Sequence, residues 1–418
     1  MLDIKLIRED APGVVKALSK RGIDAKDVVT QLASLDEKRR ELLAIQEEAN
    51  KQRNELSTSM KDAGGRPSDE VIAKGTELKD HIKKTTADLN EVEELISSLI
   101  RTLPNLPQED VQPGGESDFE VLYESNVTPR DTKETPLDYL ALLGGNIDLE
   151  RGSKVSGSRF VYLKGQLVRL EFALVSFILD TLARHDFTPV MPPVLVKEPA
   201  MAGMGYLDHE GDEIYKTQDD LYLVGTSEQA IGPMHMNEML DLKVKPLRYV
   251  GYSSCFRREA GSYGKDVKGI LRLHQFEKVE MFSFCQPKDS KTEHDFLLER
   301  QREIMDALEL PYRVLRLAGG DTGTPSSKTY DIETWIPSEG KFRETHSTSN
   351  TTDFQARRLN IRTKTDTGTE VAHMLNGTAV AMSRILIALI ENHQQMDKSI
   401  LIPKALASYL PFTSIAVK

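Results

Sequence analysis

"FRREAGSYGKDVKGILRLHQFEKVE" (residues 256–280) has two strand-like ends joined by a loop rich in Gly, Ser, Tyr and Lys. Residues two apart in a strand point to the same face of a sheet, so Arg257 and Glu259 are expected to share a row. The returning strand places a second row on one face: Arg272, His274, Phe276, Lys278 and Glu280. Burying such charges without partners costs on the order of several kcal/mol each. The pattern therefore favours a sheet face that binds a polar ligand beneath the loop 261–270, with an open, solvated face as the alternative.

The composition indicates a globular protein with a real core. The chain has 418 residues, 39% apolar and 28% charged, and this length predicts two or three domains. A formal net charge of −11 excludes a generic binder of polyanions, so any nucleic-acid surface must be local. The two cysteines, Cys255 and Cys285, form no CxxC or Cys/His cluster, so neither a disulfide framework nor a zinc site is expected.

Targeting signals are not evident in the sequence. The first residues, MLDIKLIRED, lack the apolar segment of a secretory signal, and the apolar run at 172–179 is far shorter than a membrane span. We therefore expect a soluble, cytoplasmic protein that does not contact a membrane.

Residues from about 27 to 100 carry heptad repeats. Apolar residues recur every seven positions at Val28, Leu35, Leu42, Ala49 and Leu56, and again at Val71, Leu78, Val92 and Leu99, with Thr85 in register. A second row, four positions later, holds Ile82, Leu89 and Ile96 in the second half but Arg39, Gln46 and Arg53 in the first. The 4–3 spacing is typical of a coiled-coil seam. With a turn at AGGRPS and Ser68 as an N-cap, it predicts two antiparallel helices of about 30 residues each.

The part of the predicted helical arm formed by residues 36–84 is electrically neutral. Residues 36–84 contain eleven Lys/Arg and eleven Asp/Glu, so the remainder carries the net charge of the protein. Its cations include Lys38, Lys51, Lys79, Lys83 and Lys84. Such charges suit either a solvated coiled-coil surface or a long probe that touches a phosphate backbone.

The rest of the chain mixes helices and strands after a Pro/Gly-rich linker at 101–118. Helices are predicted at 165–185 and 377–394, and strands at 188–196, 247–259 and 271–284. Neighbouring strands are not regularly separated by helices, so an α+β fold with an antiparallel sheet flanked by helices fits best.

Three further stretches have unusual polar residues. VGTSEQAI (224–231) places Thr226 and Glu228 two residues apart after an apolar strand, and KFRETHSTSN (341–350) puts Glu344 and Ser347 near a strand end. In LNGTAVAMSRILIALIENHQ (375–394) Arg384 lies within an apolar run, where an unpaired charge would be costly. Each stretch is weak evidence when taken alone.

Together and in this order, these stretches resemble the motifs of the class II aminoacyl-tRNA synthetases, and specifically those of the seryl-tRNA synthetase family, over essentially the whole chain. The segment at about 185–196, with Pro193, looks like motif 1, while about 250–284 and 375–394 are similar to motifs 2 and 3. TSE (226–228) and DFQARR (353–358) also fit the family. The resemblance implies a tRNA-binding helical arm at 1–104, with its coiled coil at about 27–100, and a class II catalytic core at 105–418.

The resemblance also implies roles for residues that would bind ATP. Arg257 would hold the α-phosphate and the substrate carboxylate, and Glu259 and Arg272 would help to place the phosphates. Phe276 would stack on adenine, and Arg384 would hold the γ-phosphate. Planar guanidinium groups suit phosphate oxygens, so Arg257 and Arg384 are catalytic candidates, and the resemblance adds Glu259 to them.

By the same resemblance, Glu344 and Ser347 would coordinate Mg²⁺, which prefers oxygen ligands. The serine pocket would consist of Thr226, Glu228, Arg257, Glu280, Asn376 and Thr378. The implied reaction joins serine to ATP as seryl-adenylate and then transfers it to the 3′ end of serine tRNA, without a covalent enzyme intermediate. The resemblance implies a homodimer whose arm grips the tRNA, and it leaves open whether selenocysteine tRNA is a second acceptor.

Two positions depart from the family pattern: Asp186 stands where motif 1 usually has glycine, and His346 where a small or β-branched residue is usual. Two alternative functions fit the sequence less well. A ligase that passes an amino acid to a carrier-protein thiol would lack the long arm, which the heptads at 28–99 argue against. A non-catalytic coiled-coil protein would have no reason to keep so many costly charges together.

Overall fold

The computed structural model describes residues 1–62, 68–128, 136–208, 211–260, 268–366 and 368–416. It divides into two compact units, Leu2–Leu106 and Pro107–Lys418, the latter with Met1. The expected turn at 63–67 and most of the loop 261–270 lie outside the described residues. Among the described helices, none is long and apolar enough to cross a membrane.

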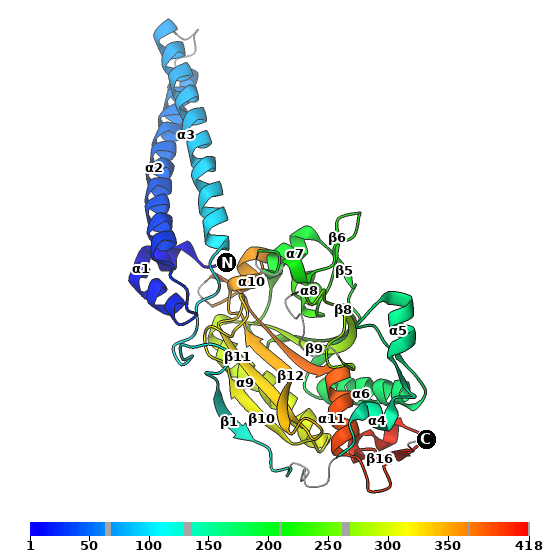
Figure 1. Cartoon of the computed structure of the whole chain (residues 1–418). Helices are drawn as coiled ribbons and strands as arrows, with labels where there is room; N and C mark the ends of the chain where they lie inside the picture. Colours follow the sequence, from blue (N-terminus) through cyan, green and yellow to red (C-terminus); the bar gives the residue numbers. More distant parts are fainter. Residues whose placement is uncertain (63–67, 129–135, 209–210, 261–267, 367, 417–418) are drawn as a thin grey trace. The chain divides into compact units, whose positions relative to one another are not determined.

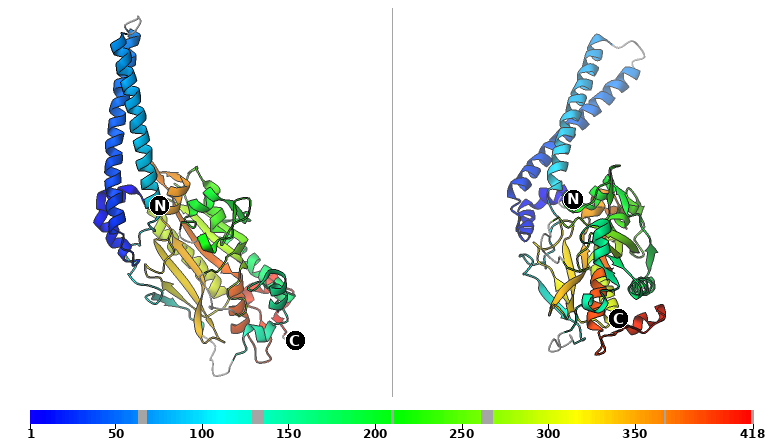
Figure 2. Two further views of the ribbon diagram at one scale, coloured as in Figure 1. Left: turned by 45° about the horizontal axis from the view of Figure 1, so that its top comes forward. Right: turned by 45° about the vertical axis from the view of Figure 1, so that its right-hand side comes forward.

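The first unit consists of three helices: α1 (Ile4–Ser19), α2 (Lys26–Asp62) and α3 (Asp69–Arg101). Figures 1 and 2 show α2 and α3 side by side and antiparallel, as the heptads predict. The heptad positions are buried or half-buried, and Ser68 caps α3 by accepting a hydrogen bond from the Val71 amide. At about 1.5 Å per residue the two helices form an arm of roughly 50–55 Å. Helix α1 was not predicted from the sequence, because the heptad repeats begin only at about residue 27.

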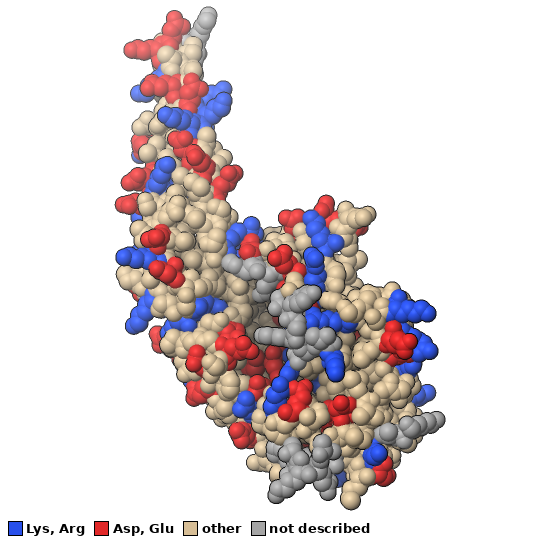
Figure 3. Space-filling view, viewed as in Figure 1, with Lys and Arg blue, Asp and Glu red and all other residues tan. Residues whose placement is uncertain are grey.

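Polar residues in the second row of α2 bond across to α3. Arg39 pairs with Glu93 at 2.9 Å, and the Gln46 amide donates to the Thr86 hydroxyl at 2.8 Å. This explains why Arg39 and Gln46 are polar, because each of these two side chains bonds to a residue of the facing helix. Figure 3 shows Lys/Arg and Asp/Glu interspersed along the visible face of the arm, with no stripe of one sign.

The second unit is built on an eight-stranded sheet in the order β1-β10-β11-β12-β15-β9-β8-β4. All neighbours are antiparallel except β4 and β8, which are parallel, so the expected antiparallel α+β sheet is confirmed. The strands are β1 (Glu120–Glu124), β4 (Phe187–Val190), β8 (Leu247–Phe256), β9 (Gln275–Cys285), β10 (Tyr312–Arg316), β11 (Lys328–Ile336), β12 (Lys341–Asn350) and β15 (His373–Ala381).

The remaining elements are short or flank the sheet. The helices are α4 (Tyr139–Leu143), α5 (Leu149–Ser156), α6 (Gln166–Ala183), α7 (Glu198–Met204), α8 (Glu228–Ile231), α9 (Ser290–Ala307), α10 (Phe354–Leu359) and α11 (Met382–Asn392). The small strands are β2 (Ile147–Asp148), β3 (Tyr162–Leu163), β5 (Leu195–Lys197), β6 (Leu221–Leu223), β7 (Met239–Leu240), β13 (Arg362–Lys364), β14 (Thr369–Val371), β16 (Ile400–Leu401) and β17 (Ser414–Ile415).

The two faces of β9 pack differently. Val279 and Met281 belong to a core cluster shared with α6, α9 and α11, whereas Phe282 and Phe284 pack with Leu359 of α10 in a second cluster. The α9 and α11 ribbons can be followed along the sheet in Figure 1. Because strand residues alternate between faces, the even-numbered residues before Phe282 point away from α6, α9 and α11.

Two predicted elements have different bounds in the structure. The strand expected at 188–196 is broken into β4 and β5, because Pro192 and Pro193 lack the amide hydrogens that would continue a ladder. The helix expected from 377 begins at Met382, since Thr378 and Val380 extend β15, which pairs with β9. β-branched residues fit such a buried strand better than a helix.

The segment expected to be a linker is attached to the second unit. The Gln108 amide donates to the Ser327 carbonyl at 3.0 Å, and Asp110 pairs with Lys328 and, at 3.1 Å, with Arg316. This segment is therefore bound to the second unit through its backbone and side chains and is not a free linker.

Candidate active site

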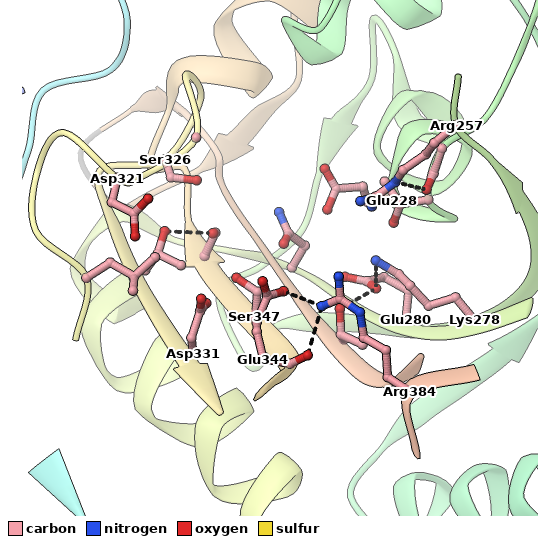
Figure 4. Close-up of a pocket in the computed structure, with 18 of the residues that line it drawn as sticks. Glu228, Arg257, Lys278, Glu280, Asp321, Ser326, Asp331, Glu344, Ser347 and Arg384 are labelled. Carbon is pink, nitrogen blue, oxygen red and sulfur yellow. Dashed lines mark hydrogen bonds and ion pairs between the residues drawn. The ribbon is translucent and has the colours of Figure 1, made fainter. Parts of the chain in front are cut away.

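A cavity of about 1080 Å³ opens on the face of the sheet opposite to α9 and α11. Among the residues that line it are most of the predicted site residues: Thr226, Glu228, Arg257, Glu259, Arg272, Glu280, Glu344, Ser347, Asn376, Thr378 and Arg384. They come from segments far apart in the sequence and meet because β8, β9, β15 and β12 are consecutive neighbours in the sheet. Figure 4 shows the labelled side chains converging on this space.

The pair of strands around the opening stretch is shorter than the alternation predicted. β8 ends at Phe256, so Arg257 and Glu259 lie beyond it, and Glu259 has a φ of 52°. The expected strand row is therefore wrong for these two residues, and also for Arg272 and His274, which precede the start of β9 at Gln275. Arg257 and Glu259 still face the cavity because the backbone is held: the Arg257 amide donates to the His274 carbonyl at 3.0 Å, and Arg257 Nε to the Gly225 carbonyl at 3.2 Å.

Arg272 and Phe276 lie on the returning side of this hairpin. The Arg272 guanidinium forms an ion pair with Glu259 at 2.6 Å, so two of the predicted ATP-binding residues hold each other in place. Phe276 is absent from the described lining, although the Arg257 guanidinium lies 5.4 Å from its ring centre. Its predicted contact with adenine therefore remains a prediction.

One end of the cavity contains two buried carboxylates, Glu228 and Glu280, which are 4% and 1% exposed. Burial raises the pKa of Glu228, against the lowering effects of Lys278 and the Tyr206 hydroxyl, which donates to it. Burial also raises the pKa of Glu280 to about 7, although Lys278 opposes this. Carboxylates held in this way favour a ligand that brings positive charge or hydrogen-bond donors.

Hydroxyl and amide side chains surround the two carboxylates. The Thr378 hydroxyl donates to Glu280 at 3.3 Å, and Thr226 Oγ1 is buried with no partner among the described residues. Asn376 lies two residues before Thr378 on the same strand face, because β15 pairs regularly with β9 there. An unpaired buried hydroxyl costs about 1–3 kcal/mol, which a bound ligand could recover.

The middle of the cavity is formed by Glu344 of β12 and Arg384 of α11. Arg384 Nη1 donates to the Glu344 carboxylate at 2.8 Å and to its carbonyl at 2.9 Å. The surrounding protein alone would raise the pKa of Glu344, but the Arg384 guanidinium outweighs this and lowers it. The carboxylate is thus kept ionised beside a guanidinium that faces the cavity.

A group of oxygen atoms beside this pair suits a hard cation. Ser347 lies on the same strand as Glu344, and its hydroxyl bonds to Asp331, whose Oδ1 is buried without a partner among the described residues. Within the part of the chain that the structure describes, no three His, Cys, Asp or Glu side chains are grouped to hold a metal by themselves. Mg²⁺ commonly takes one or two carboxylates and completes its shell with phosphate oxygens and water, so these residues fit it.

The structure adds residues that sequence reasoning did not assign. Lys278 lines the cavity and pairs with Glu280 at 2.6 Å, and Tyr206 holds Glu228. The alternation Phe276, Lys278, Glu280 could have singled out Lys278. Tyr206 lies outside the motifs. Only the tertiary structure brings it near α8, so no sequence signal could have identified it.

Both departures from the family pattern have local explanations. Asp186 has a φ of 64°, the left-handed region that favours glycine and that Asp tolerates better than most residues. The buried His346 ring bonds to the Thr345 hydroxyl at 2.9 Å and the Ala379 carbonyl at 3.1 Å, and burial lowers its pKa to about 4. His346 is therefore a neutral core residue.

Comparisons with known proteins agree with this geometry. Residues 213–393 match the model of the tRNA synthetase class II core domain (G, H, P, S and T), and residues 1–107 match the seryl-tRNA synthetase N-terminal domain. The fold and the site thus define a class II aminoacyl-tRNA synthetase.

Similar proteins identify the branch of the class. The serine–tRNA ligase of Thermobifida fusca is 42% identical over 98% of this chain and 97% of its own, and that of Streptomyces coelicolor is 43% identical over 98% and 97%. The seryl-tRNA synthetase of Pyrococcus horikoshii, solved with ATP, has a TM-score of 0.93 at 39% identity, covering 100% of both chains. The cytoplasmic serine–tRNA ligase of Naegleria fowleri, solved with AMP, has a TM-score of 0.89 at 29% identity, covering 100% of this chain and 99% of its own. The chain belongs to the serine–tRNA ligase family.

Proposed function

We propose that this protein activates serine with ATP to form seryl-adenylate and pyrophosphate, and then transfers serine to the 3′ end of serine tRNA. The observation that carries the proposal is the buried end of the cavity. There, two carboxylates with raised pKa values, an unpaired hydroxyl and a guanidinium surround a small space. A zwitterion with a hydroxyl side chain complements these groups.

Each polar group of serine has a counterpart in this pocket. Arg257 binds the carboxylate, and Glu228 and Thr226 bind the ammonium group. Glu280 accepts a hydrogen bond from the serine hydroxyl, and Thr378 holds Glu280 in place. Asn376 completes the wall. Alanine leaves the hydroxyl-binding groups unpaired, which is the physical basis for rejecting it.

ATP occupies the wider part of the cavity, where Arg257 and Arg384 contact its phosphates and Phe276 its adenine. Glu259 and Arg272, which pair with each other, help to place the phosphates. Support comes from the guanidinium groups of Arg257 and Arg384, which face the cavity and can bind phosphate oxygens. Glu344 and Ser347 would hold Mg²⁺, and the cation would neutralise charge on the phosphates. The neighbouring oxygen of Asp331, which has no partner among the described residues, supports a cation at this place.

The chemistry depends on positioning and charge stabilisation, as is usual for transfer of nucleotidyl and phosphoryl groups. A carboxylate oxygen of serine bonds to the α-phosphorus while the bond to the pyrophosphate oxygen breaks. The terminal 3′-hydroxyl of tRNA then attacks the acyl carbon, loses its proton and releases AMP. Arg257 contacts the α-phosphate throughout the first step. Because serine reacts directly with ATP, no side chain of the protein becomes covalently attached.

The helical arm binds serine tRNA by shape and backbone contacts. Its interspersed charges on the face seen in Figure 3 suit scattered contacts with phosphates better than a basic groove. We also infer a homodimer formed through the motif 1 region, where Met191 and Leu195 are 84% and 41% exposed. As a translation enzyme, it works in the cytoplasm.

The test is amino-acid-dependent exchange of pyrophosphate into ATP, run with each of the twenty amino acids, with Mg²⁺ and without tRNA. Exchange with serine alone supports the proposal, and charging of serine tRNA then tests the acceptor. Exchange with glycine or alanine would indicate the ligase that serves a carrier protein. No exchange from folded protein would indicate a non-catalytic protein and contradict the proposal.

A further inference from the structure

A lysine and a glutamate form a buried ion pair on the wall of the cavity. Lys278 and Glu280 are two residues apart on β9, so both point to the same face. Their charged groups lie 2.6 Å apart, and the residues are 6% and 1% exposed. Lys and Glu are almost never buried so completely without a specific reason, because removing both charges from water is costly. Figure 4 shows the pair beside Arg384.

The two oxygens of Glu280 have different surroundings. Oε2 is the atom that pairs with Lys278 and also accepts from the Thr378 hydroxyl, at 3.3 Å. Oε1 has no hydrogen bond to any residue that the structure describes. One oxygen is therefore anchored by the protein, and the other remains available to a ligand in the cavity.

We propose that Lys278 is a positioning residue for substrate specificity: it holds Glu280 through Oε2 and favours its ionised form, so that Oε1 is left as an acceptor for a hydrogen bond from the substrate. This inference rests on the proposed function, in which Glu280 meets the serine hydroxyl, and it explains how the selectivity arises. An ionised carboxylate accepts only, whereas a protonated carboxyl group also donates. Only a substrate that brings a donor, such as a hydroxyl, satisfies an obligate acceptor.

Charge balance in the pocket supports this role. With serine bound, Arg257 faces the substrate carboxylate and Glu228 faces the ammonium group. Glu280 is then left without a charged partner on the substrate, because a hydroxyl is neutral. Lys278 supplies this partner from the protein, so that every charge in the buried pocket is paired.

The titration of Glu280 depends on its neighbours. Burial raises its pKa to about 7, Lys278 lowers it, and Glu228 raises it. The other charged or titratable groups facing this part of the cavity are Tyr206, Arg257, Glu344 and Arg384, with Cys255 buried beneath. Loss of the Lys278 charge would leave burial and Glu228 to raise the pKa of Glu280 further, so that a larger fraction of the carboxyl group is protonated at neutral pH.

The first test is the Lys278→Met variant, which keeps the unbranched side chain as far as Cε but removes the charged ammonium group. We measure serine-dependent and alanine-dependent pyrophosphate exchange between pH 6 and 9, with Lys288→Met as a control at an exposed lysine. The expected kcat/KM for serine at pH 7 falls by about 100-fold, and the preference for serine over alanine falls by at least about 10-fold. The acidic limb of the pH profile moves up by about one unit or more, while KM for ATP changes by less than about 3-fold.

A second test separates an effect through Glu280 from a purely structural one. In a Glu280→Gln background there is no carboxylate to position, so adding Lys278→Met should change kcat/KM for serine by less than about 3-fold. The double variant lacks both members of the buried ion pair, so it can be measured even if Lys278→Met alone does not fold.

The outcomes are distinct. A uniform loss of activity with serine and alanine at every pH, or equal losses in the wild-type and Glu280→Gln backgrounds, would overturn the role of Lys278. If the wild-type protein shows no exchange with serine, the proposed function itself fails. Serine exchange by the wild-type protein together with unchanged selectivity in Lys278→Met refutes this inference alone.

Discussion

Arg384, near the start of α11, donates through one nitrogen to both the carboxylate and the backbone carbonyl of Glu344 on β12. The two residues are forty positions apart, and the contact fixes the side chain that is proposed to bind a phosphate against the one proposed to bind Mg²⁺. Because the guanidinium also lowers the pKa of Glu344, the pair is organised before ATP arrives. Such preorganisation is a main source of electrostatic stabilisation in catalysis.

Replacing Arg384 with alanine should lower kcat for serine-dependent pyrophosphate exchange by about 100-fold or more, because the γ-phosphate loses its cation. The Arg362→Ala variant, on the exposed strand β13, serves as the control and should retain activity. Activity within a few-fold of wild type for Arg384→Ala would remove this residue from the catalytic machinery.

Replacing Arg257 with alanine should abolish adenylate formation while leaving the fold intact. Arg257 lies beyond the end of β8, half-exposed at the cavity wall, so its loss removes contacts to ligands and not core packing. Circular dichroism checks the fold and pyrophosphate exchange checks the chemistry. An exchange rate near wild type would disprove the assignment.

The Glu280→Gln variant should discriminate less well against alanine. A glutamine can still meet the serine hydroxyl but is not an obligate acceptor, so alanine leaves a smaller penalty. We expect the ratio of kcat/KM for serine to that for alanine to fall by about 10-fold or more. The matched control is Glu333→Gln, at the opposite part of the cavity. Unchanged discrimination in Glu280→Gln would show that the hydroxyl is recognised elsewhere.

Removing the helical arm should separate the two steps of the reaction. A variant that lacks residues 1–104 should still exchange pyrophosphate but charge serine tRNA poorly, because the adenylate site lies wholly in the second unit. Full charging by this variant would mean that the arm is only a solvated coiled coil.

A finer version keeps the arm and reverses three of its exposed charges, Lys79, Lys83 and Lys84, to glutamate. Exchange should be unchanged, whereas kcat/KM for tRNA should fall by about 10-fold or more at low salt and by less at high salt. The control reverses Lys288 in the second unit. Equal effects at the two salt concentrations would argue against phosphate contacts.

Stability should fall in mild acid because of buried histidines. Burial lowers the pKa of His294 to about 4, whereas in the unfolded chain it is about 6.5. The unfolded state therefore binds a proton first as pH drops, and the free energy of unfolding decreases between about pH 6.5 and 4 by on the order of 2–3 kcal/mol from this group.

The His294→Gln variant tests this expectation, since glutamine can still donate to the Thr348 carbonyl that the ring contacts. Urea unfolding is followed at pH 7 and pH 5 through the single tryptophan, Trp335. The difference between the two pH values should be smaller in the variant than in the wild type, and unchanged in His81→Gln on the arm. An equal difference in all three proteins would disprove the assignment.

Much of the site was predictable because sequence neighbours keep their spacing after folding. Heptads at 28–99 predict the antiparallel arm, because seven residues return to one side of a helix wherever that helix lies. Thr226 with Glu228 and Glu344 with Ser347 are likewise local pairs, and the order of the motifs identified the family.

Only the tertiary structure decided how these local pieces combine. Arg257 and Glu259 lie beyond β8, which ends at Phe256 and not at 259 as predicted, and α11 begins after a longer strand because Thr378 and Val380 pair with β9. These choices depend on partners that are distant in sequence, which no local pattern contains. Lys278 and Glu280 illustrate both parts. Their spacing of two residues in a strand, which the sequence alone determined, places them on the same face. Only the tertiary structure buries both side chains, and burial requires the two charges to pair.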